Sequence, residues 1–219
     1  MHPIAPGVWQ LAGWPRDFFN IYLIDDVLID AGTRWARKRI IRQLAGRTIR
    51  SVVLTHCHPD HQGSAHAICT QFGVPLACHE ADVAATEGRA PMVARPRLER
   101  LTQFMWAGPP HPVGRVLRDG DEIAGFRVVH TPGHTPGHIC LFRESDRLAI
   151  AGDLLANIHF VTRQPGLREP PRVFSTDAAQ NRRSIQTLID LKPALVCFGH
   201  GPPLRESAQL DHFRAPPLP

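Results

Sequence analysis

Side chains that can bind a metal ion cluster near residue 60 of the sequence. His56, His58, Asp60 and His61 occur within six residues, directly after a short apolar run. Side chains alternate in an extended segment, so His56 and His58 can face one cation. Pro59 can then turn the chain so that Asp60 and His61 face a second cation. Imidazole and carboxylate suit zinc and similar ions. The spacing therefore predicts a metal site rather than an exposed histidine-rich loop.

Three further residues of ligand type are expected at the ends of strands. His134 lies in a Pro/Gly turn after an apolar run, and Asp153 and His200 each follow a buried run beside a glycine. Glycine lets the backbone pack close to a site. Strands that end at one edge of neighbouring sheets would bring these three side chains to the first cluster, so we expect a single site.

The pattern of short apolar runs and amphipathic stretches predicts an α/β chain that positions these ligands. It predicts strands at 8–11, 19–24, 27–30, 51–54, 74–78, 126–130, 138–142, 148–151 and 195–198, and helices at 34–44, 63–72, 80–87 and 177–191. Segments 88–120 and 154–175 are expected to be surface excursions from a single domain spanning 1–219. Strands and helices follow in a similar order in both halves, which indicates two sheet-plus-helix halves packed together.

The composition is that of a globular protein. The 219 residues are 43% hydrophobic, carry 25 Lys and Arg against 20 Asp and Glu, and include five cysteines. Scattered cysteines and the lack of a signal or long apolar run predict reduced thiols, a cytoplasmic location and no membrane contact. The net charge of +5 is modest and the basic residues are not interleaved with aromatic ones. A small-molecule partner is therefore favoured over nucleic acid. A homo-oligomer is compatible with the sequence.

The spaced ligands resemble those of the metallo-β-lactamase superfamily. The resemblance covers nearly the whole chain, from the Asp-Ala-Gly turn at Asp30 to the Gly-His-Gly near the end. It rests on an HxHxDH motif and three later residues, namely His56, His58, Asp60, His61, His134, Asp153 and His200. It implies an α/β (α+β) fold, a four-layer αββα sandwich with a two-metal site at one edge of the sheets.

The resemblance also implies a role for each of these residues. It assigns one ion to His56, His58 and His134, the other to Asp60, His61 and His200, and the bridging position to Asp153. Two zinc ions per chain are expected, with iron or manganese as alternatives. A hydroxide activated by the two ions would attack a carbonyl group. Asp60 would be the catalytic residue that orients it and carries a proton, and Asp30 would hold a ligand histidine.

Hydrolysis of a thioester or lactone in a small intracellular substrate is the leading prediction for the reaction. Segments 131–138 and 151–153 are similar to those of glyoxalase II-like hydrolases, but 154–159 differs from the Gly-Arg-Ser-Asp of those enzymes. Related lactonases use a late tyrosine, whereas Tyr22 is the only tyrosine here. His159 is a candidate for binding substrate. A mononuclear iron persulfide dioxygenase-like oxidoreductase is the alternative. A nuclease, phosphodiesterase or β-lactamase is less favoured.

Overall fold

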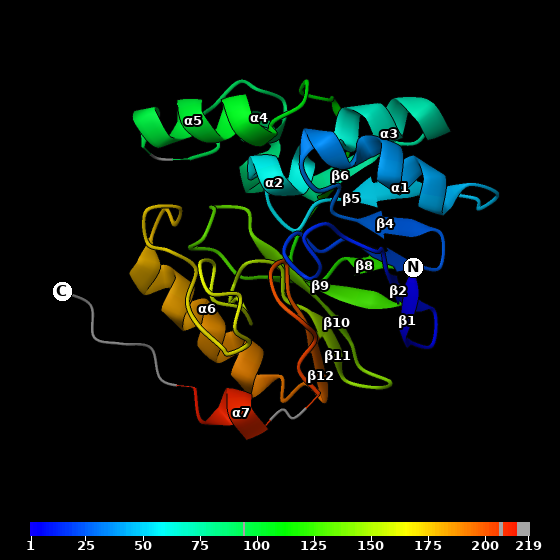
Figure 1. The fold of residues 1–219 in the computed structure, drawn as a ribbon. Coiled ribbons are helices and arrows are strands. Elements are labelled where there is room, and N and C mark those ends of the chain that lie inside the picture. The colour runs from blue at the N-terminus through cyan, green and yellow to red at the C-terminus, as the bar shows by residue number, and fades with distance from the viewer. Residues whose placement is uncertain (94, 206–207, 214–219) are drawn as a thin grey trace.

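Two β-sheets pack face to face in the computed structural model, which describes residues 1–93, 95–205 and 208–213 (Figure 1). Within these residues the first sheet has seven strands in chain order. They are β1 (His2–Ala5), β2 (Val8–Gln10), β3 (Tyr22–Ile24), β4 (Val27–Ile29), β5 (Ser51–Val53), β6 (Leu76–His79) and β7 (Val113–Leu117). The second sheet has the order β12-β11-β10-β9-β8. Its strands are β8 (Glu122–Ile123), β9 (Phe126–His130), β10 (Ile139–Arg143), β11 (Leu148–Ile150) and β12 (Leu195–Cys197).

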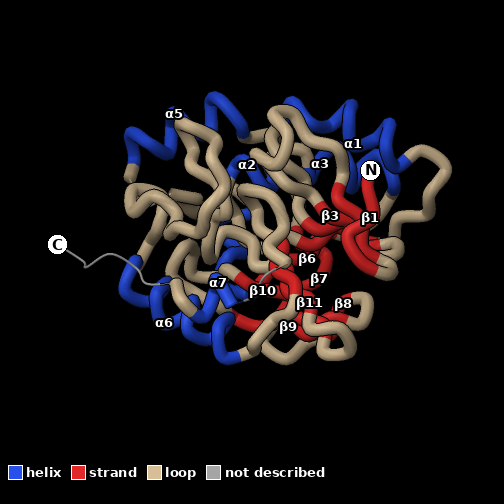
Figure 2. The backbone as a smooth tube through the Cα atoms, turned by 60° about the horizontal axis from the view of Figure 1, so that its bottom comes forward, coloured by secondary structure: helices blue, strands red, loops and turns tan. Residues whose placement is uncertain are grey.

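Helices lie on the outer sides of the two sheets (Figure 2). Those that follow strands of the first sheet are η1 (Arg34–Ala36), α1 (Arg37–Leu44), α2 (Pro59–Gln62), α3 (Ala65–Phe72), η2 (Glu80–Asp82), α4 (Val83–Thr86) and α5 (Pro96–Trp106). Those that belong to the second half are α6 (Ala178–Asp190) and α7 (Ala208–Asp211). The side chain of Asp177 accepts a hydrogen bond from the Gln180 amide at 2.9 Å, which caps the start of α6 at the expected place.

Three buried clusters of apolar side chains define four layers. Tyr22 of the first sheet and Phe126 of the second belong to the cluster between the sheets. Leu23 points to the opposite face, as strand alternation requires, and packs with Ile40 of α1 and with residues of α3. A third cluster joins the second sheet to Ile185 of α6. The layer order is helices, sheet, sheet, helix, so the predicted αββα sandwich is confirmed.

The loops that carry the predicted ligands leave the strands at their carboxyl ends. β4 to β7 run parallel to one another in the first sheet. In the second sheet β11 and β12 are parallel, and β9 runs the same way because both β9 and β11 are antiparallel to β10. The loops after β5, β9, β11 and β12 can therefore meet at one edge. These are the loops with the HxHxDH motif, His134, Asp153 and His200.

The segment 88–120 differs from the expected surface excursion. Its middle, 97–106, has a weakly helical pattern and forms α5 as expected. The unexpected element is β7, which pairs with β6 at the edge of the first sheet. The apolar pattern of β7 is interrupted by Gly114 and Arg115, and three of its five residues are exposed, so the sequence gives little strand signal. β1 is also unexpected, because a proline such as Pro3 argues against a strand. The strand lies at the edge of the sheet, where a proline is tolerated. Segment 154–175 is irregular, with one isolated bridge between Ala156 and Arg168.

The cysteines are placed as the composition suggests. All five are buried and unpaired, so the prediction of free thiols is confirmed. Cys57, although it lies between two predicted ligands, packs in an apolar cluster with Met92 and Val93 and does not belong to the candidate metal-binding groups. Among the described helices, none has both the length and the apolar character needed to cross a bilayer.

Candidate metal centre

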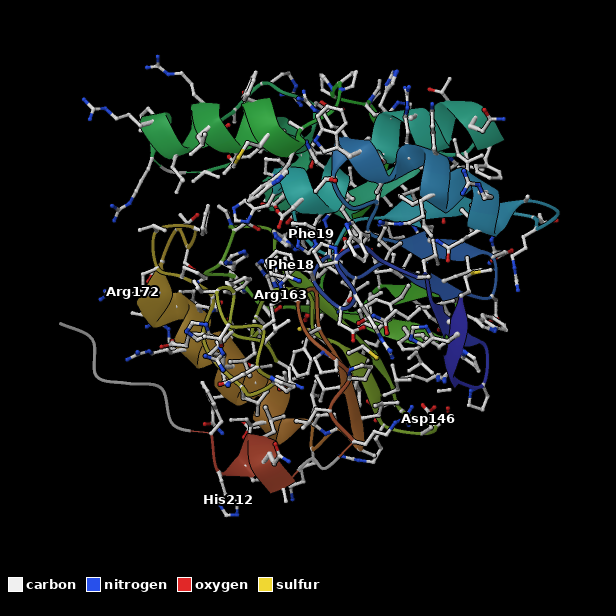
Figure 3. All side chains as sticks on the ribbon, viewed as in Figure 1. Phe18, Phe19, Asp146, Arg163, Arg172 and His212 are labelled. Atoms are coloured by element: carbon white, nitrogen blue, oxygen red, sulfur yellow. The ribbon has the colours of Figure 1, made fainter. Side chains whose placement is uncertain are left out.

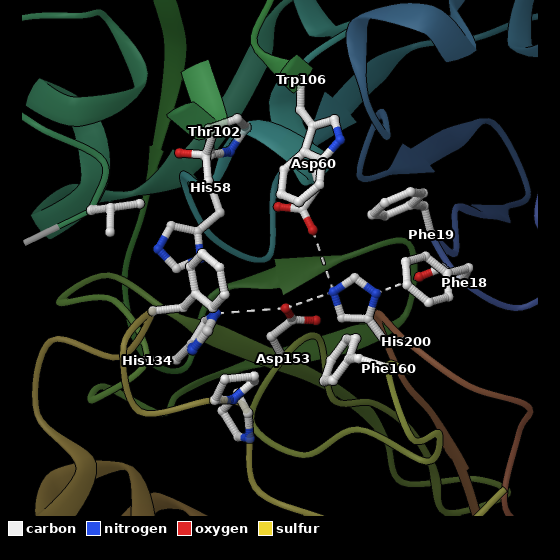
Figure 4. A pocket seen from close by; sticks show the side chains of 15 residues that line it. Phe18, Phe19, His58, Asp60, Thr102, Trp106, His134, Asp153, Phe160 and His200 are labelled. Carbon is white, nitrogen blue, oxygen red and sulfur yellow. Dashed lines mark hydrogen bonds and ion pairs between the residues drawn. The ribbon is translucent and has the colours of Figure 1, made fainter. Parts of the chain in front are cut away.

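The predicted ligands gather around the carboxylate of Asp153, just after β11. Figure 4 shows His134 and His200 on either side of this carboxylate. The Nε2 atoms of His56, His61, His134 and His200 lie 3.9, 3.4, 3.5 and 3.0 Å from its oxygen atoms. The first two of these histidines follow β5 of the first sheet, whereas the others follow β9 and β12 of the second. Both sheets therefore contribute side chains to one buried cluster.

The potential ligand atoms form three overlapping groups, in each of which all atoms lie within 4.8 Å of one another. The groups are His56, His58 and His134; His56, His61 and Asp153; and Asp60, His61 and His200. The structure thus brings all seven predicted ligands together. The first and last groups are the two sets that the resemblance assigned to separate ions. Asp153 approaches a histidine of each set, which is the geometry expected of a bridging carboxylate.

Five buried polar atoms of the cluster have no hydrogen-bond partner among the described residues. They are Nε2 of His56, His58, His61 and His134, and Oδ1 of Asp153. An unpaired buried polar atom costs about 1–3 kcal/mol, and buried groups are rarely left in this state. Imidazole nitrogens and carboxylate oxygens that face each other are the donors a zinc-class cation takes. The residues therefore fit the cations that the resemblance implies.

Hydrogen bonds on the far side of the rings aim two histidines at the centre. Asp30 Oδ2 accepts from His61 Nδ1 at 2.8 Å, and the main-chain carbonyl of Phe18 accepts from His200 Nδ1. A carbonyl or ionised carboxylate cannot donate, so each Nδ1 carries the hydrogen and each Nε2 is turned to the cluster. Asp30 thus contacts a ligand histidine, the role that the resemblance implies for it.

Asp30 also helps to orient a second ligand histidine, His56. It accepts hydrogen bonds from the amide and the hydroxyl of Thr55 at 2.8 and 2.9 Å. The same hydroxyl lies 3.0 Å from His56 Nδ1. Because the hydroxyl proton points to the carboxylate, His56 Nδ1 donates to the hydroxyl oxygen. One carboxylate thereby orients His61 directly and His56 through Thr55.

Asp82 is a second buried carboxylate at the site, and it is not among the residues predicted from the sequence. Its Oδ2 accepts from the Cys57 amide at 3.0 Å and from Thr135 Oγ1 at 2.7 Å, and its Oδ1 accepts from the Gly137 amide at 2.7 Å. These bonds join the chain between the first two histidines to the loop that carries His134. An acid at the start of α4 resembles a helix cap, yet this side chain makes no cap bond.

The histidines of the cluster differ in protonation state because their surroundings shift their pKa values in opposite directions. Burial lowers the pKa of His56 and of His134, so both rings are neutral and offer a lone pair. Burial also opposes the charged forms of His61 and His200. Nearby carboxylates, with Asp153 foremost, outweigh burial and raise both pKa values, that of His200 to about 10. In the metal-free chain, protons on these two rings balance buried carboxylates where a cation would be held.

The cluster lies at one side of a pocket of about 240 Å³. Its walls include the apolar side chains Phe18, Phe19, Val93, Trp106, Phe160 and Phe174. Phe18 and Phe19 lie where the two halves of the molecule meet (Figure 3). Phe160 and Phe174 come from the second excursion. Among the described residues that line this pocket, none is a lysine or an arginine.

His159 is placed differently from the expected substrate contact. Its Nδ1 accepts hydrogen bonds from the amides of Val161 and Thr162, at 3.3 and 3.1 Å, within its own loop. The neighbouring Phe160 lines the pocket instead. The sequence could not separate these two because both lie in an irregular segment. This segment therefore presents an aromatic wall to the cluster.

The αββα fold and the candidate metal centre together identify the class of protein to which the chain belongs. The sequence model of the metallo-β-lactamase superfamily matches residues 14–200. The chain belongs to that superfamily, and the resemblance is confirmed.

Several proteins of known sequence or structure are similar to the chain. The probable metallo-hydrolase YybB of Bacillus subtilis (strain 168) is 31% identical over 179 residues, which cover 81% of this chain and 76% of YybB. The hydroxyacylglutathione hydrolase GloC of Haemophilus influenzae is 32% identical over 109 residues, 49% of this chain and 50% of GloC. The structure of TTHA1623 in a di-iron-bound form matches with a TM-score of 0.61, at 26% identity and 92% coverage of both chains. The chain is thus related to metallo-hydrolases.

Proposed function

We propose that the chain is a metal-dependent hydrolase that cleaves a thioester or lactone of a small molecule at a two-metal site. The observation that carries this proposal is the convergence of seven ligand-type side chains beside an apolar pocket. Similarity to a probable metallo-hydrolase and to a hydroxyacylglutathione hydrolase supports the reaction class. Two zinc ions are the proposed cofactor, and similarity to a di-iron-bound structure supports iron as the alternative.

The chain's own residues prepare the transfer of a proton. Bound cations supply Lewis-acid chemistry, which lowers the pKa of a water molecule and polarises a carbonyl group. Asp60 lines the pocket, and its Oδ2 lies 3.4 Å from His200 Nε2. Burial raises the pKa of the Asp60 carboxyl, but His61 and His200 outweigh burial and hold that pKa below its ordinary value. Asp60 is therefore ionised at neutral pH and can accept a proton from the attacking water.

Hydrolysis forms one bond to the carbonyl carbon and breaks another. The water oxygen adds to the carbonyl carbon, and the C–S bond of a thioester or the C–O bond of a lactone breaks. Asp60 passes the proton it received to the leaving sulfur or oxygen. The products are a carboxylic acid and a thiol or alcohol. The main-chain carbonyl of Phe18 keeps His200 oriented beside Asp60 throughout.

The walls of the pocket support a carbonyl substrate over a phosphodiester. Phe18, Phe19 and Phe160 offer apolar surface for the group next to the scissile bond. Apart from the histidines of the metal centre, the described lining of the pocket has no lysine or arginine to pair with the permanent negative charge of a phosphodiester. An uncharged acyl group needs no such partner.

An assay of the metal-loaded protein against thioesters, lactones, β-lactams and phosphodiesters tests the proposal. We expect turnover of a thioester or lactone, and about two metal ions per chain by elemental analysis. A preference for phosphodiesters or β-lactams would contradict the proposal. A single iron per chain together with oxidation of a persulfide would favour the oxidoreductase alternative instead.

The role of Asp60 is tested by Asp60→Asn, which keeps an oxygen ligand but removes the base. We expect kcat to fall by about 100-fold or more, with an unchanged circular dichroism spectrum. Asp146→Asn is the matched control, because Asp146 lies in the turn between β10 and β11 and pairs with Arg143. Full activity in Asp60→Asn would overturn the assignment.

A further inference from the structure

A second hollow of about 250 Å³ lies beside the metal pocket. Trp14, Trp35 and Arg39 line it together with Phe19 and Trp106, and we call it the tryptophan groove. Phe19 and Trp106 also line the metal pocket, and their ring centroids lie 5.8 Å apart. The two hollows are therefore neighbours that share this pair of rings.

Exposed aromatic rings form the outer part of the tryptophan groove. Trp14 is 82% exposed and Trp35 is 71% exposed. Large apolar side chains that gather at the surface often mark a binding site. Trp35 is also fixed in orientation, because its Nε1 donates a hydrogen bond of 2.8 Å to the carbonyl of Met105 at the end of α5. The groove thus holds an indole ring in place while leaving most of it uncovered.

Among the described residues, no acidic side chain forms an ion pair with Arg39 of the tryptophan groove or with Arg34 beside Trp35. The Nε atoms of Arg34 and Arg39 are buried without a hydrogen-bond partner in the described part of the chain. Burial lowers the pKa of Arg39, and no carboxylate opposes this effect. The guanidinium of Arg34 lies 4.5 Å from the centroid of the Trp35 ring. A partly buried cation without a counter-charge is costly, and an anion placed beside it would remove that cost.

The metal pocket and the tryptophan groove differ in charge. The described lining of the metal pocket contains Asp60 and Asp153 but no lysine or arginine, whereas the described lining of the groove contains Arg39 and no acidic residue. A molecule that extends across Phe19 and Trp106 would meet apolar walls at one end and a guanidinium group at the other. The two hollows together favour a ligand with one apolar and one anionic end.

We propose that the tryptophan groove binds a carboxylate or phosphate group at the far end of the substrate whose scissile carbonyl lies in the metal pocket. This inference rests on the proposed function and adds the anionic end to the substrate class. The guanidinium of Arg39 has the planar pair of donors that matches such an oxyanion. Trp14 and Trp35 would pack against the part of the substrate that links the scissile carbonyl to the oxyanion.

Binding of uncleavable analogues tests the groove without relying on turnover. Three thioethers share one aryl end and carry a neutral amide, a carboxylate or a phosphate at the other end. Calorimetry on the zinc-loaded protein should show at least one anionic thioether binding about tenfold tighter than the amide. Whichever of the carboxylate and phosphate thioethers binds more tightly identifies the anionic group that the groove prefers. Equal affinity for all three would overturn the proposal.

Variants of α1 and η1 locate the effect. Arg39→Ala should abolish the preference for the anion, whereas Arg42→Ala, an exposed position on the same helix, should retain it. Trp35→Ala should weaken all three thioethers, and Trp35→Phe should restore most of the affinity by retaining a ring. An anion preference that survives in Arg39→Ala would contradict the assignment.

Kinetics and vesicle binding separate the remaining outcomes. With the matching thioesters, Arg39→Ala should raise the KM of the anionic compound about tenfold relative to that of the neutral compound. If no ester is cleaved but the anionic thioether still binds through Arg39, the proposed function fails and the groove stands. If the protein binds vesicles of anionic lipid through Trp14 and Arg39 and shows no preference among the thioethers, the groove proposal is wrong and this face contacts a membrane.

Discussion

Asp82 and Thr135 are 53 residues apart in the sequence and are joined by a buried hydrogen bond of 2.7 Å, from the Thr135 hydroxyl to Asp82 Oδ2. Thr135 follows His134 directly, and the same oxygen of Asp82 accepts the amide of Cys57, which lies between His56 and His58. The three histidines of the first candidate group therefore sit on two segments that a single carboxylate holds together.

The first prediction is that Asp82→Ala weakens metal binding although Asp82 is absent from the candidate ligand groups. Loss of a residue that positions ligands typically costs 10–100-fold in metal affinity. We expect a loss of about this size in a competition titration against a chelating dye. Asp146→Ala is the control, since that carboxylate is at the surface. Metal affinity equal to that of the unaltered protein in Asp82→Ala would show that the link does not position the ligands.

The ligands themselves could be predicted because each is marked locally in the sequence. Four lie in one short motif, and His134, Asp153 and His200 stand beside strand ends and glycines. The groups that orient these ligands carry no such mark. The carbonyl of Phe18 belongs to the backbone, which every residue has, and the partners of Asp82 are brought close only by the packing of distant segments.

The fold shows the same division between local and distant information. Strands buried on both faces, such as β4 and β5, read as apolar runs and are predicted correctly. β7 is mostly exposed and gains its place only by pairing with β6, so its own residues give little signal. The sequence also could not show that Phe160 rather than His159 lines the pocket, because the geometry of a loop depends on contacts with distant segments.

The second prediction concerns the pH dependence of the metal-free protein. His61 and His200 have raised pKa values in the folded chain, that of His200 about 10 against an ordinary 6.5. Their stabilising effect is therefore complete below about pH 6.5 and is lost as pH rises through about 10. We expect the Tm of the chelator-treated protein to fall between pH 7 and pH 10. A Tm that rises over this range would contradict the charge assignment.

Loading with metal gives a second test of the same charge assignment, because it should release the protons that these two rings carry. At pH 7, we expect about two protons per chain from His61 and His200 when the group of Asp60, His61 and His200 takes up its cation. Calorimetry in buffers of different ionisation enthalpy measures this number. The neutral rings of His56 and His134 contribute none. Metal uptake without proton release would mean that the metal-free site is not protonated as described.

The third prediction is that Gly199→Ala damages the metal site. A Cβ at this position would lie 2.1 Å from Asp153 Oδ1 and 2.7 Å from His61 Cε1. Asp153 would have to move, so we expect metal affinity to fall about tenfold or more and the free energy of unfolding to fall by about 1–3 kcal/mol. Gly46→Ala is the control, because its added Cβ meets nothing within 4 Å although its φ is +76°. That variant should lose some stability but keep its metal affinity, whereas equal affinity in both variants would refute the close packing at Asp153.

The fourth prediction is that all five cysteines are unreactive in the folded protein. Burial raises the pKa of Cys69, Cys78, Cys140 and Cys197 to about 12, and that of Cys57 well above its ordinary value. The reactive thiolate is therefore scarce at pH 8, and the sulfur atoms are shielded from solvent. An aromatic disulfide reagent should label none of them in buffer and all five in 6 M guanidinium chloride, a concentration of roughly the order that unfolds most domains. Rapid labelling of one cysteine in buffer would show that its segment opens readily, and for Cys57 this would place the opening at the metal-binding loop itself.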